Sequence, residues 1–271
     1  MLPLSSVFTR TDLDHDPTEY HLVEFYLLII VTQGTGSHCI DFKPYPYKKG
    51  TVFTIRKDQI HKFVANPDVS GTLLLFTNEF LVSYLEKLES QRTLQLFNEL
   101  LGAPLLQLNP GEFEDTLAQL QRLEREYFEV EDAYSLNIIR SELQILIARL
   151  FRIKSRQEAG LSAVPRLNDF IRFQNLAETN ITKKSKVSDY AQLLGASTKT
   201  LNKLTKSTVH KTAKEFLDEI HLKQIKRLLI NSKHSIKEIA YQSGFEEPTN
   251  FYKFFKRHTQ VTPEQFRSLQ R

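Results

Sequence analysis

The stretch that decides how the C-terminal part of this chain folds is SIKEIAYQSGFEEPTNFYKFFKRHTQVTPEQFR, residues 235–267. A short amphipathic segment is followed by Gly244, a residue that readily takes the left-handed backbone conformation of a tight turn. Pro248 is a favoured first residue of a helix, and in the segment after it Phe251 and Phe254 lie three positions apart, as the inward residues of a helix do. This order predicts a helix-turn-helix unit.

The same pattern occurs about 50 residues earlier, in VSDYAQLLGASTKTLNKLTKSTVHKTAKEF, residues 187–216. Small, turn-forming, apolar and basic positions all coincide: Ala191 with Ala240, Gly195 with Gly244, Leu201 with Phe251, Leu204 with Phe254, Lys206 with Lys256 and Phe216 with Phe266. A single pattern of this kind occurs in many helical hairpins. Two copies in a basic segment indicate a DNA-binding domain.

Charge is divided unevenly along the 271 residues. Residues 166–271 contain 20 Lys and Arg against 10 Asp and Glu, whereas residues 1–165 contain 16 against 22. The C-terminal part is therefore the candidate for binding a polyanion, although many solvated domains are basic and charge alone is a weak indication.

Residues 235–267 resemble the signature stretch of the AraC/XylS family of transcription regulators, and the likeness extends from near Leu167 to Arg271. The matching features are Ile239-Ala240, Gly244-Phe245, Phe251, the run Phe254-Phe255-Lys256, Thr262-Pro263 and Phe266-Arg267. The resemblance implies that a long helix, residues 213–232, joins the two units rigidly. Two recognition helices would then enter successive major-groove segments of double-stranded DNA, about 34 Å apart.

Residues on the outer face of each recognition helix are the candidates for contact with DNA. Inward-facing leucines on the first helix, and Phe251, Phe254 and Phe255 on the second, would turn the polar residues outward. We expect base contacts from Lys199, Asn202, Lys203, Thr249, Tyr252 and Lys253, and phosphate contacts from Lys206, Lys256 and Arg257. Lys203 and Lys253 can donate to guanine, and Asn202 can pair with an adenine edge. The alternative for each residue alone is a solvated surface position.

The N-terminal part, residues 1–110, is predicted to form a sensor domain. Short strands separated by turns between His21 and Phe76 suggest a β-sandwich or barrel. The segment is similar to the cupin-type barrel of many AraC-family regulators in Phe25-Tyr26, Gly34-x-Gly36, Tyr45-Pro46, Gly50 and Gln59-x-His61. We expect an effector pocket that includes His21, Phe25, His38, Phe53 and His61.

A metal-dependent activity is not expected in this barrel. The second histidine that a metal-binding cupin would place after His21 is replaced by Val23, and no carboxylate stands at a convincing ligand position. We therefore expect no metal, no cofactor and no enzymatic activity. Two alternatives stay open: a metal-dependent cupin enzyme fused to a DNA-binding module, and a regulator whose barrel binds a protein partner.

Residues 111–157 are predicted to be helical and to form a dimerisation segment. Phe113 to Phe128 has a helical period. Apolar residues then recur at the 3–4 spacing of a coiled-coil seam: Leu136, Ile139, Leu143, Leu146, Leu150 and Ile153. The alternative is a helix that lies on its own domain. Residues 158–165 are polar and small, with Gly160 and Pro165, and are the expected linker before the DNA-binding domain, residues 166–271.

The expected fold class is therefore a multidomain α+β protein, with a cupin-like barrel and helical dimerisation segment before an all-α domain of two helix-turn-helix units. The expected function is sequence-specific transcription regulation by a ligand-responsive activator, with RNA polymerase, a second copy of the chain and an unidentified small-molecule effector as partners. No apolar run approaches the length of a membrane span, and the N-terminus does not resemble a secretory signal. Cys39 is the only cysteine, which excludes an internal disulfide and fits the cytoplasm.

Overall fold

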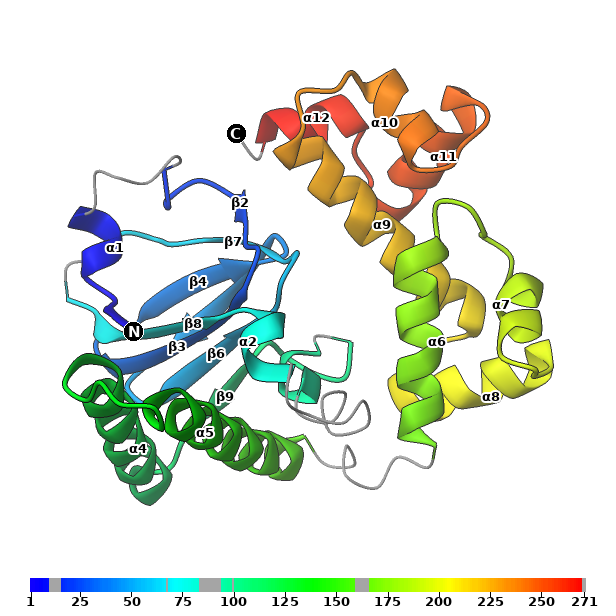
Figure 1. Ribbon diagram of the computed structural model, residues 1–271. Helices are drawn as coiled ribbons and strands as arrows, with labels where there is room; N and C mark the ends of the chain where they lie inside the picture. Colours follow the sequence, from blue (N-terminus) through cyan, green and yellow to red (C-terminus); the bar gives the residue numbers. More distant parts are fainter. Residues whose placement is uncertain (10–15, 67, 83–93, 99, 159–165, 270–271) are drawn as a thin grey trace. The chain divides into compact units, whose positions relative to one another are not determined.

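The chain, seen here as a computed structural model, is described over residues 1–9, 16–66, 68–82, 94–98, 100–158 and 166–269 (Figure 1). It forms two compact units, Met1–Leu161 and Ser162–Arg271. The first is rich in β-sheet and the second is helical, which confirms the predicted fold class. Of the expected linker, residues 158–165, all but Glu158 lie outside the described residues.

Two antiparallel sheets form the body of the first unit. Five strands are joined in the order β1-β8-β3-β6-β9, and four in the order β2-β7-β4-β5. The strands are β1 (Leu2–Pro3), β2 (His21–Leu22), β3 (Tyr26–Gln33), β4 (Gly36–Ile40), β5 (Lys43–Tyr47), β6 (Thr51–Ile55), β7 (Ile60–Lys62), β8 (Ser70–Phe76) and β9 (Leu105–Gln107).

Strand β3 is apolar from Leu27 to Val31 because both of its faces are buried there. Side chains alternate along a strand, so Ile29 and Val31 face one way and Leu28 and Ile30 the other. Ile29 and Val31 belong to a core shared with the four-stranded sheet. Leu28 and Ile30 belong to a second core, beneath the helices of this unit.

Two long antiparallel helices, α4 (Pro110–Phe128) and α5 (Ser135–Gln157), cover the outer face of the five-stranded sheet (Figure 1). The unit also contains α1 (Ser6–Thr9), α2 (Asn78–Val82) and the 3-10 turn η1 (Leu94–Phe97). Helix α4 begins at a capping box, in which Asn109 and Glu112 satisfy each other's backbone N–H groups, with Pro110 in the first helical position.

The predicted dimerisation seam is wrong for most of its residues. Leu143, Leu146, Leu150 and Ile153 are at most 7% exposed and lie in the core beneath α5, and Ile139 packs at its edge. Only Leu136 is open to solvent, at 49% exposure. A 3–4 spacing fits a partner helix and a domain's own core equally well. Here Ile147 widens the buried stripe of α5, and residues of α4, η1 and the sheet pack against that stripe.

The second unit consists of helices packed around a central one. They are α6 (Leu167–Asn180), α7 (Val187–Leu193), α8 (Thr198–Val209), α9 (Ala213–Asn231), α10 (Ile236–Gln242), α11 (Pro248–Thr259) and α12 (Pro263–Leu269). Helix α9 contacts α6, α7, α8, α10 and α12. On its inner side the ring of Phe216 packs 5.1 Å from Phe170 and 5.3 Å from Phe173, between ring centroids. No helix within the described ranges is long and apolar enough to cross a membrane.

Candidate nucleic-acid interface and effector pocket

The two sequence repeats fold into the same helix-turn-helix geometry. In both turns a glycine takes a positive φ, +61° at Gly195 and +84° at Gly244. The residue after each glycine donates its N–H to the carbonyl of the buried alanine of the first helix, Ala196 to Ala191 at 2.9 Å and Phe245 to Ala240 at 3.1 Å. Each bond closes the end of a short helix and sets the direction of the next one.

Helix α8 presents a basic face to solvent. Ser197 caps its first turn by accepting the N–H of Thr200 at 3.0 Å. Leu201 and Leu204 are at most 5% exposed and hold the helix against the domain. Because successive residues turn by about 100° around a helix, this packing directs Lys199, Lys203 and Lys206 outward. All three lysines are exposed, and a residue must be exposed to contact DNA.

Helix α11 is held in the equivalent way by Phe251 and Phe255, both 0% exposed. Phe254, expected to be fully inward, is half-buried against Phe245 and His221, whose rings lie 5.5 and 5.2 Å away between centroids. Exposed positions on the opposite side include the predicted DNA-contacting residues Thr249, Lys253, Lys256 and Arg257.

Asn250 was missed by the sequence analysis. It is exposed and lies about 60° around the helix from Lys253, on the same face. A helical projection anchored on Phe251 and Phe255 would have found it. The sequence analysis instead treated Phe254 as fully inward, which rotated the expected outer face away from Asn250.

Asn202 and Tyr252 are placed differently from the prediction. The amide nitrogen of Asn202 donates to the Thr198 carbonyl at 3.0 Å, and its amide oxygen accepts the N–H of Ala213 at 3.0 Å. Each end of this amide therefore already has a partner within the domain, and these two hydrogen bonds fix its orientation. The hydroxyl of Tyr252 donates to the carboxylate of Glu264, a hydrogen bond that raises the pKa of Tyr252 to about 12.

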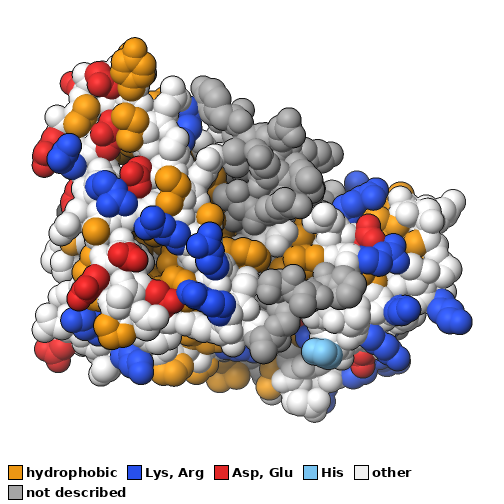
Figure 2. All heavy atoms as spheres, turned by 90° about the horizontal axis from the view of Figure 1, so that it is seen from below, with side chains coloured by type: hydrophobic (Ala, Val, Ile, Leu, Met, Phe, Trp, Pro, Cys, Tyr) orange, Lys and Arg blue, Asp and Glu red, His pale blue; other side chains and the backbone are white. Residues whose placement is uncertain are grey.

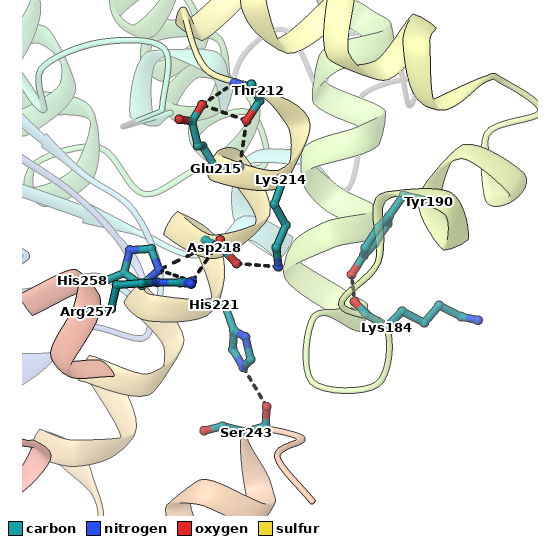
Figure 3. A network of polar contacts seen from close by, with 10 residues as sticks. All are labelled: Lys184, Tyr190, Thr212, Lys214, Glu215, Asp218, His221, Ser243, Arg257 and His258. Atoms are coloured by element: carbon teal, nitrogen blue, oxygen red, sulfur yellow. Dashed lines mark hydrogen bonds and ion pairs between the residues drawn. The ribbon is translucent and has the colours of Figure 1, made fainter. Parts of the chain in front are cut away.

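A buried carboxylate on α9 ties this helix to the C-terminal end of α11 (Figure 3). Asp218 is 8% exposed and accepts Lys214 Nζ at 2.8 Å. Arg257 Nη2 lies 3.8 Å and His258 Nε2 4.0 Å from its other oxygen. Arg257, at the end of α11, is therefore held near α9 by an ion pair with Asp218.

Helix α9 also contacts the turn of the second helix-turn-helix. His221 Nε2 lies 2.7 Å from the Ser243 carbonyl oxygen (Figure 3). The ring of His221 also stacks on Phe245. Burial lowers the pKa of His221, so the neutral ring with a proton on Nε2 donates this bond at neutral pH. At the other repeat, the hydroxyl of Tyr190 donates to the Lys184 carbonyl at 2.6 Å and secures α7. The nineteen residues of α9, which lies between the two helix-turn-helix units in the chain, form a helix about 28 Å long.

A pocket opens on the inner faces of the two sheets in the first unit. Its empty volume is about 300 Å³, including the open mouth. The lining residues are Leu4, Phe8, Ile29, Val31, Ser37, His38, Tyr47, Phe53, Phe63, Val64 and Val69. Of the expected pocket residues, His38 and Phe53 line it, whereas His21, Phe25 and His61 do not.

The three histidines of the barrel do lie close together. The rings of His21 and His61 are 4.4 Å apart between centroids, and His38 Nε2 is 3.1 Å from His61 Nδ1. Burial, followed by the charge of His21, lowers the pKa of His38 to about 3. Within the described ranges, no group of three or more His, Cys, Asp and Glu side chains is arranged to hold a metal ion.

Comparisons with known proteins agree with both halves of this geometry. Residues 4–163 match the AraC-like ligand binding domain, and residues 190–268 match a helix-turn-helix domain. The HTH-type transcriptional activator RhaS of Escherichia coli is 24% identical over 258 residues, which cover 93% of this chain and 87% of RhaS.

Two solved structures are also similar to this chain. ToxT from Vibrio cholerae is 16% identical, covers 92% of this chain and 91% of its own, and has a TM-score of 0.49. The C-terminal domain of the response regulator yesN from Fusobacterium nucleatum is 29% identical over 37% of this chain and 98% of its own, with a TM-score of 0.35. The match to the AraC-like ligand binding domain covers more than half of the chain, and two helix-turn-helix units follow that domain. This chain therefore belongs to the AraC/XylS family of DNA-binding transcription regulators.

Proposed function

We propose that this chain is a ligand-responsive transcription activator that reads two successive major-groove segments with α8 and α11. The observation that carries the proposal is the equivalent basic face on both recognition helices, each fixed to its domain by two buried apolar residues. The name of RhaS, a transcriptional activator, supports activation over repression. An activator of this kind works in the cytoplasm, in contact with RNA polymerase at its promoter.

We assign base contacts to the outward residues that the structure leaves open, and phosphate contacts to those nearer the helix ends. The base-contacting set is Lys199, Lys203, Thr249, Asn250 and Lys253, and the phosphate-contacting set is Lys206, Lys256 and Arg257. A lysine in the major groove donates to guanine O6 and N7, whereas a lysine beside the backbone neutralises charge without reading sequence.

Binding of the full chain to duplex DNA tests this assignment. Affinity should fall steeply between 50 and 200 mM salt, because each neutralised phosphate releases counterions. The double variant Lys203→Ala Lys253→Ala should lose the preference for one base pair in each half-site, with about 1–3 kcal/mol of discrimination lost at each. Lys43→Ala, which removes an exposed lysine from β5, is the matched control and should bind as the wild type does. An unchanged preference at every base pair in the double variant would contradict the assignment.

We propose that the effector occupies the pocket of the first unit and is a neutral, mainly apolar molecule. Eight of the eleven lining residues are apolar and none is an acid, a lysine or an arginine. His38 is neutral there, because burial keeps its pKa far below 7. Such a wall offers hydrogen bonds only through Ser37, His38 and Tyr47, too few for the many hydroxyls of a sugar.

A substitution at the mouth of the pocket separates this proposal from DNA binding. Val64 lines the pocket and is 47% exposed, so Val64→Trp can fill the mouth without disturbing the core. Leu193→Trp, equally exposed on α7, is the matched control. Calorimetry should detect indole or 1-octanol binding to the wild type and the control, and not to Val64→Trp. Binding of D-xylose, or failure of both apolar probes, would contradict the effector class and leave DNA binding as a separate question.

We propose a homodimer through the solvent side of α5 in place of the predicted seam. Figure 2 shows hydrophobic side chains exposed among charged ones on the face that α4 and α5 form. The exposed large apolar residues of these helices and their connection are Tyr127, Phe128, Tyr134, Leu136, Ile138 and Ile145. Ile138 and Ile145 lie one heptad apart, as residues facing a partner helix do. Sedimentation of Ile138→Lys Ile145→Lys should show monomers where the wild type is dimeric, and a monomeric wild type would contradict the proposal.

A further inference from the structure

Positions 202 and 252 correspond to each other in the two repeats and share an unusual placement. Each lies about 100° around its recognition helix from the outward lysine that follows it, Lys203 or Lys253, at the edge of the exposed face. Both side chains are half-buried, and both reach toward the start of the next helix.

At the first repeat the contact satisfies a helix end. The first N–H groups of any helix lack partners within the helix. In α9, Thr212 accepts the N–H of Glu215, and the amide oxygen of Asn202 accepts the N–H of Ala213 at 3.0 Å. Ala213 is 0% exposed, so this donor has no access to water, and Asn202 is what compensates for its burial.

At the second repeat the residue at the same position contacts the start of the next helix in a different way. The first residue of α12 is Pro263, which has no N–H to satisfy. Tyr252 instead donates its hydroxyl to Glu264, the second residue of that helix. The rest of the cap is conserved between the repeats, because Thr262 accepts the N–H of Gln265 as Thr212 accepts that of Glu215.

We propose that residues 202 and 252 are joints, which fix the angle between each recognition helix and the helix that follows, and thereby position Lys203 and Lys253, rather than residues that read bases. Two chemically unrelated side chains, an amide and a phenol, make the equivalent contact. Their partners belong to the following helix and not to the groove-facing surface. The inference rests on the proposed DNA contacts, and it assigns to Asn202 and Tyr252 a positioning role within them.

The first joint is tested in the full chain with Asn202→Ala and Asn202→Asp. Reading adenine needs both the donor and the acceptor of the amide, whereas the joint needs only an acceptor. Asn202→Asp should therefore keep the hydrogen-exchange protection of the Ala213 amide and the wild-type base preference. Asn202→Ala should lose that protection and bind about fivefold more weakly to DNA whose first half-site is intact, with no change in base preference, as expected from the loss of one capping bond.

Scrambled half-sites distinguish positioning from a general loss of structure. On DNA whose first half-site is scrambled, Asn202→Ala and the wild type should bind equally, because the first helix-turn-helix then makes no specific contact. On DNA whose second half-site is scrambled, the variant should be weaker. If both Asn202 variants instead lose preference at one base pair, or if Asn202→Ala is weaker on all DNA alike, the first joint is refuted.

The second joint is tested by a double-mutant cycle in DNA affinity. Tyr252→Phe removes only the hydroxyl, and Glu264→Ala removes its acceptor. If the two act as one joint, each variant should weaken binding about fivefold, the double variant should be no weaker than either, and base preference should not change. Tyr241→Phe, at an exposed tyrosine of α10, is the control and should have no effect. Multiplying losses, or an altered base preference in Tyr252→Phe, would overturn the assignment of this residue as a joint.

Discussion

Alanine in place of Gly244 should destabilise the second unit far more than alanine in place of Gly195. Both glycines have a positive φ, so both substitutions force a side chain into the left-handed region, at a cost of about 1–2 kcal/mol. Their surroundings differ. A Cβ on Gly195 would meet no atom within 4 Å, whereas one on Gly244 would lie 1.9 Å from the Thr182 carbonyl oxygen.

That clash sets the magnitude of the difference. The obstructing atom belongs to backbone in the segment after α6, so relief requires the chain itself to move. Forced repacking of this kind costs about 1–3 kcal/mol beyond the conformational penalty. Gly244→Ala should therefore lose about 2–5 kcal/mol, against about 1–2 for Gly195→Ala.

Native-state hydrogen exchange of the full chain measures this difference without assuming that the two units unfold together. Protection in α10 and α11 should fall about 5- to 140-fold further in Gly244→Ala than in Gly195→Ala, because the extra cost is about 1–3 kcal/mol and each factor of ten corresponds to about 1.4 kcal/mol. Equal losses in the two variants, or a larger loss at Gly195, would refute the close approach between the second turn and Thr182.

Three further predictions concern the core, the DNA contacts and pH. Leu146→Ala should cost the first unit about 2–5 kcal/mol of stability because its side chain is fully buried, whereas Val64→Ala, 47% exposed in the wild type and outside the proposed dimer face, should leave the urea midpoint unchanged. Lys253→Ala should relax preference at one base pair, whereas Lys256→Ala should weaken all sequences alike and reduce the salt slope by about one unit, in selections from random DNA. The pKa of His38 is lowered to about 3 in the folded protein, so the unfolded chain binds this proton first as the pH falls. Stability should therefore decline by about 1.4 kcal/mol per pH unit from about 6.5 down to 3, and His38→Phe should flatten that decline in urea titrations.

The second unit was predictable because its signals are local. The glycine turns, Pro248 and the spacing of apolar residues all act within a few positions, and α9 ends one residue from its predicted end. The apolar run in β3 likewise supported the expected strands between His21 and Phe76, since a run buried on both faces has no polar alternation to obscure it.

The seam and the base-reading set were harder because they depend on what lies opposite each residue. Leu143 and Leu150 have the spacing of a coiled coil, and no local feature tells that α4 and the sheet fill the space that a partner would take. The outward position of Asn202 was evident from the helical period. That Ala213, eleven residues later, would bring a buried N–H to it was not.

Selection of binding sites for the full chain from a library of random duplex DNA is the most direct test of the proposal that both helix-turn-helix units read DNA. Two conserved blocks should emerge, with centres about 10–10.5 base pairs apart, one for each recognition helix. Lys203→Ala should change one block only and Lys253→Ala only the other, and inserting half a helical turn between the blocks should abolish specific binding. A single conserved block, or two blocks that tolerate the insertion, would contradict the claim that α8 and α11 read successive major-groove segments from one rigid unit.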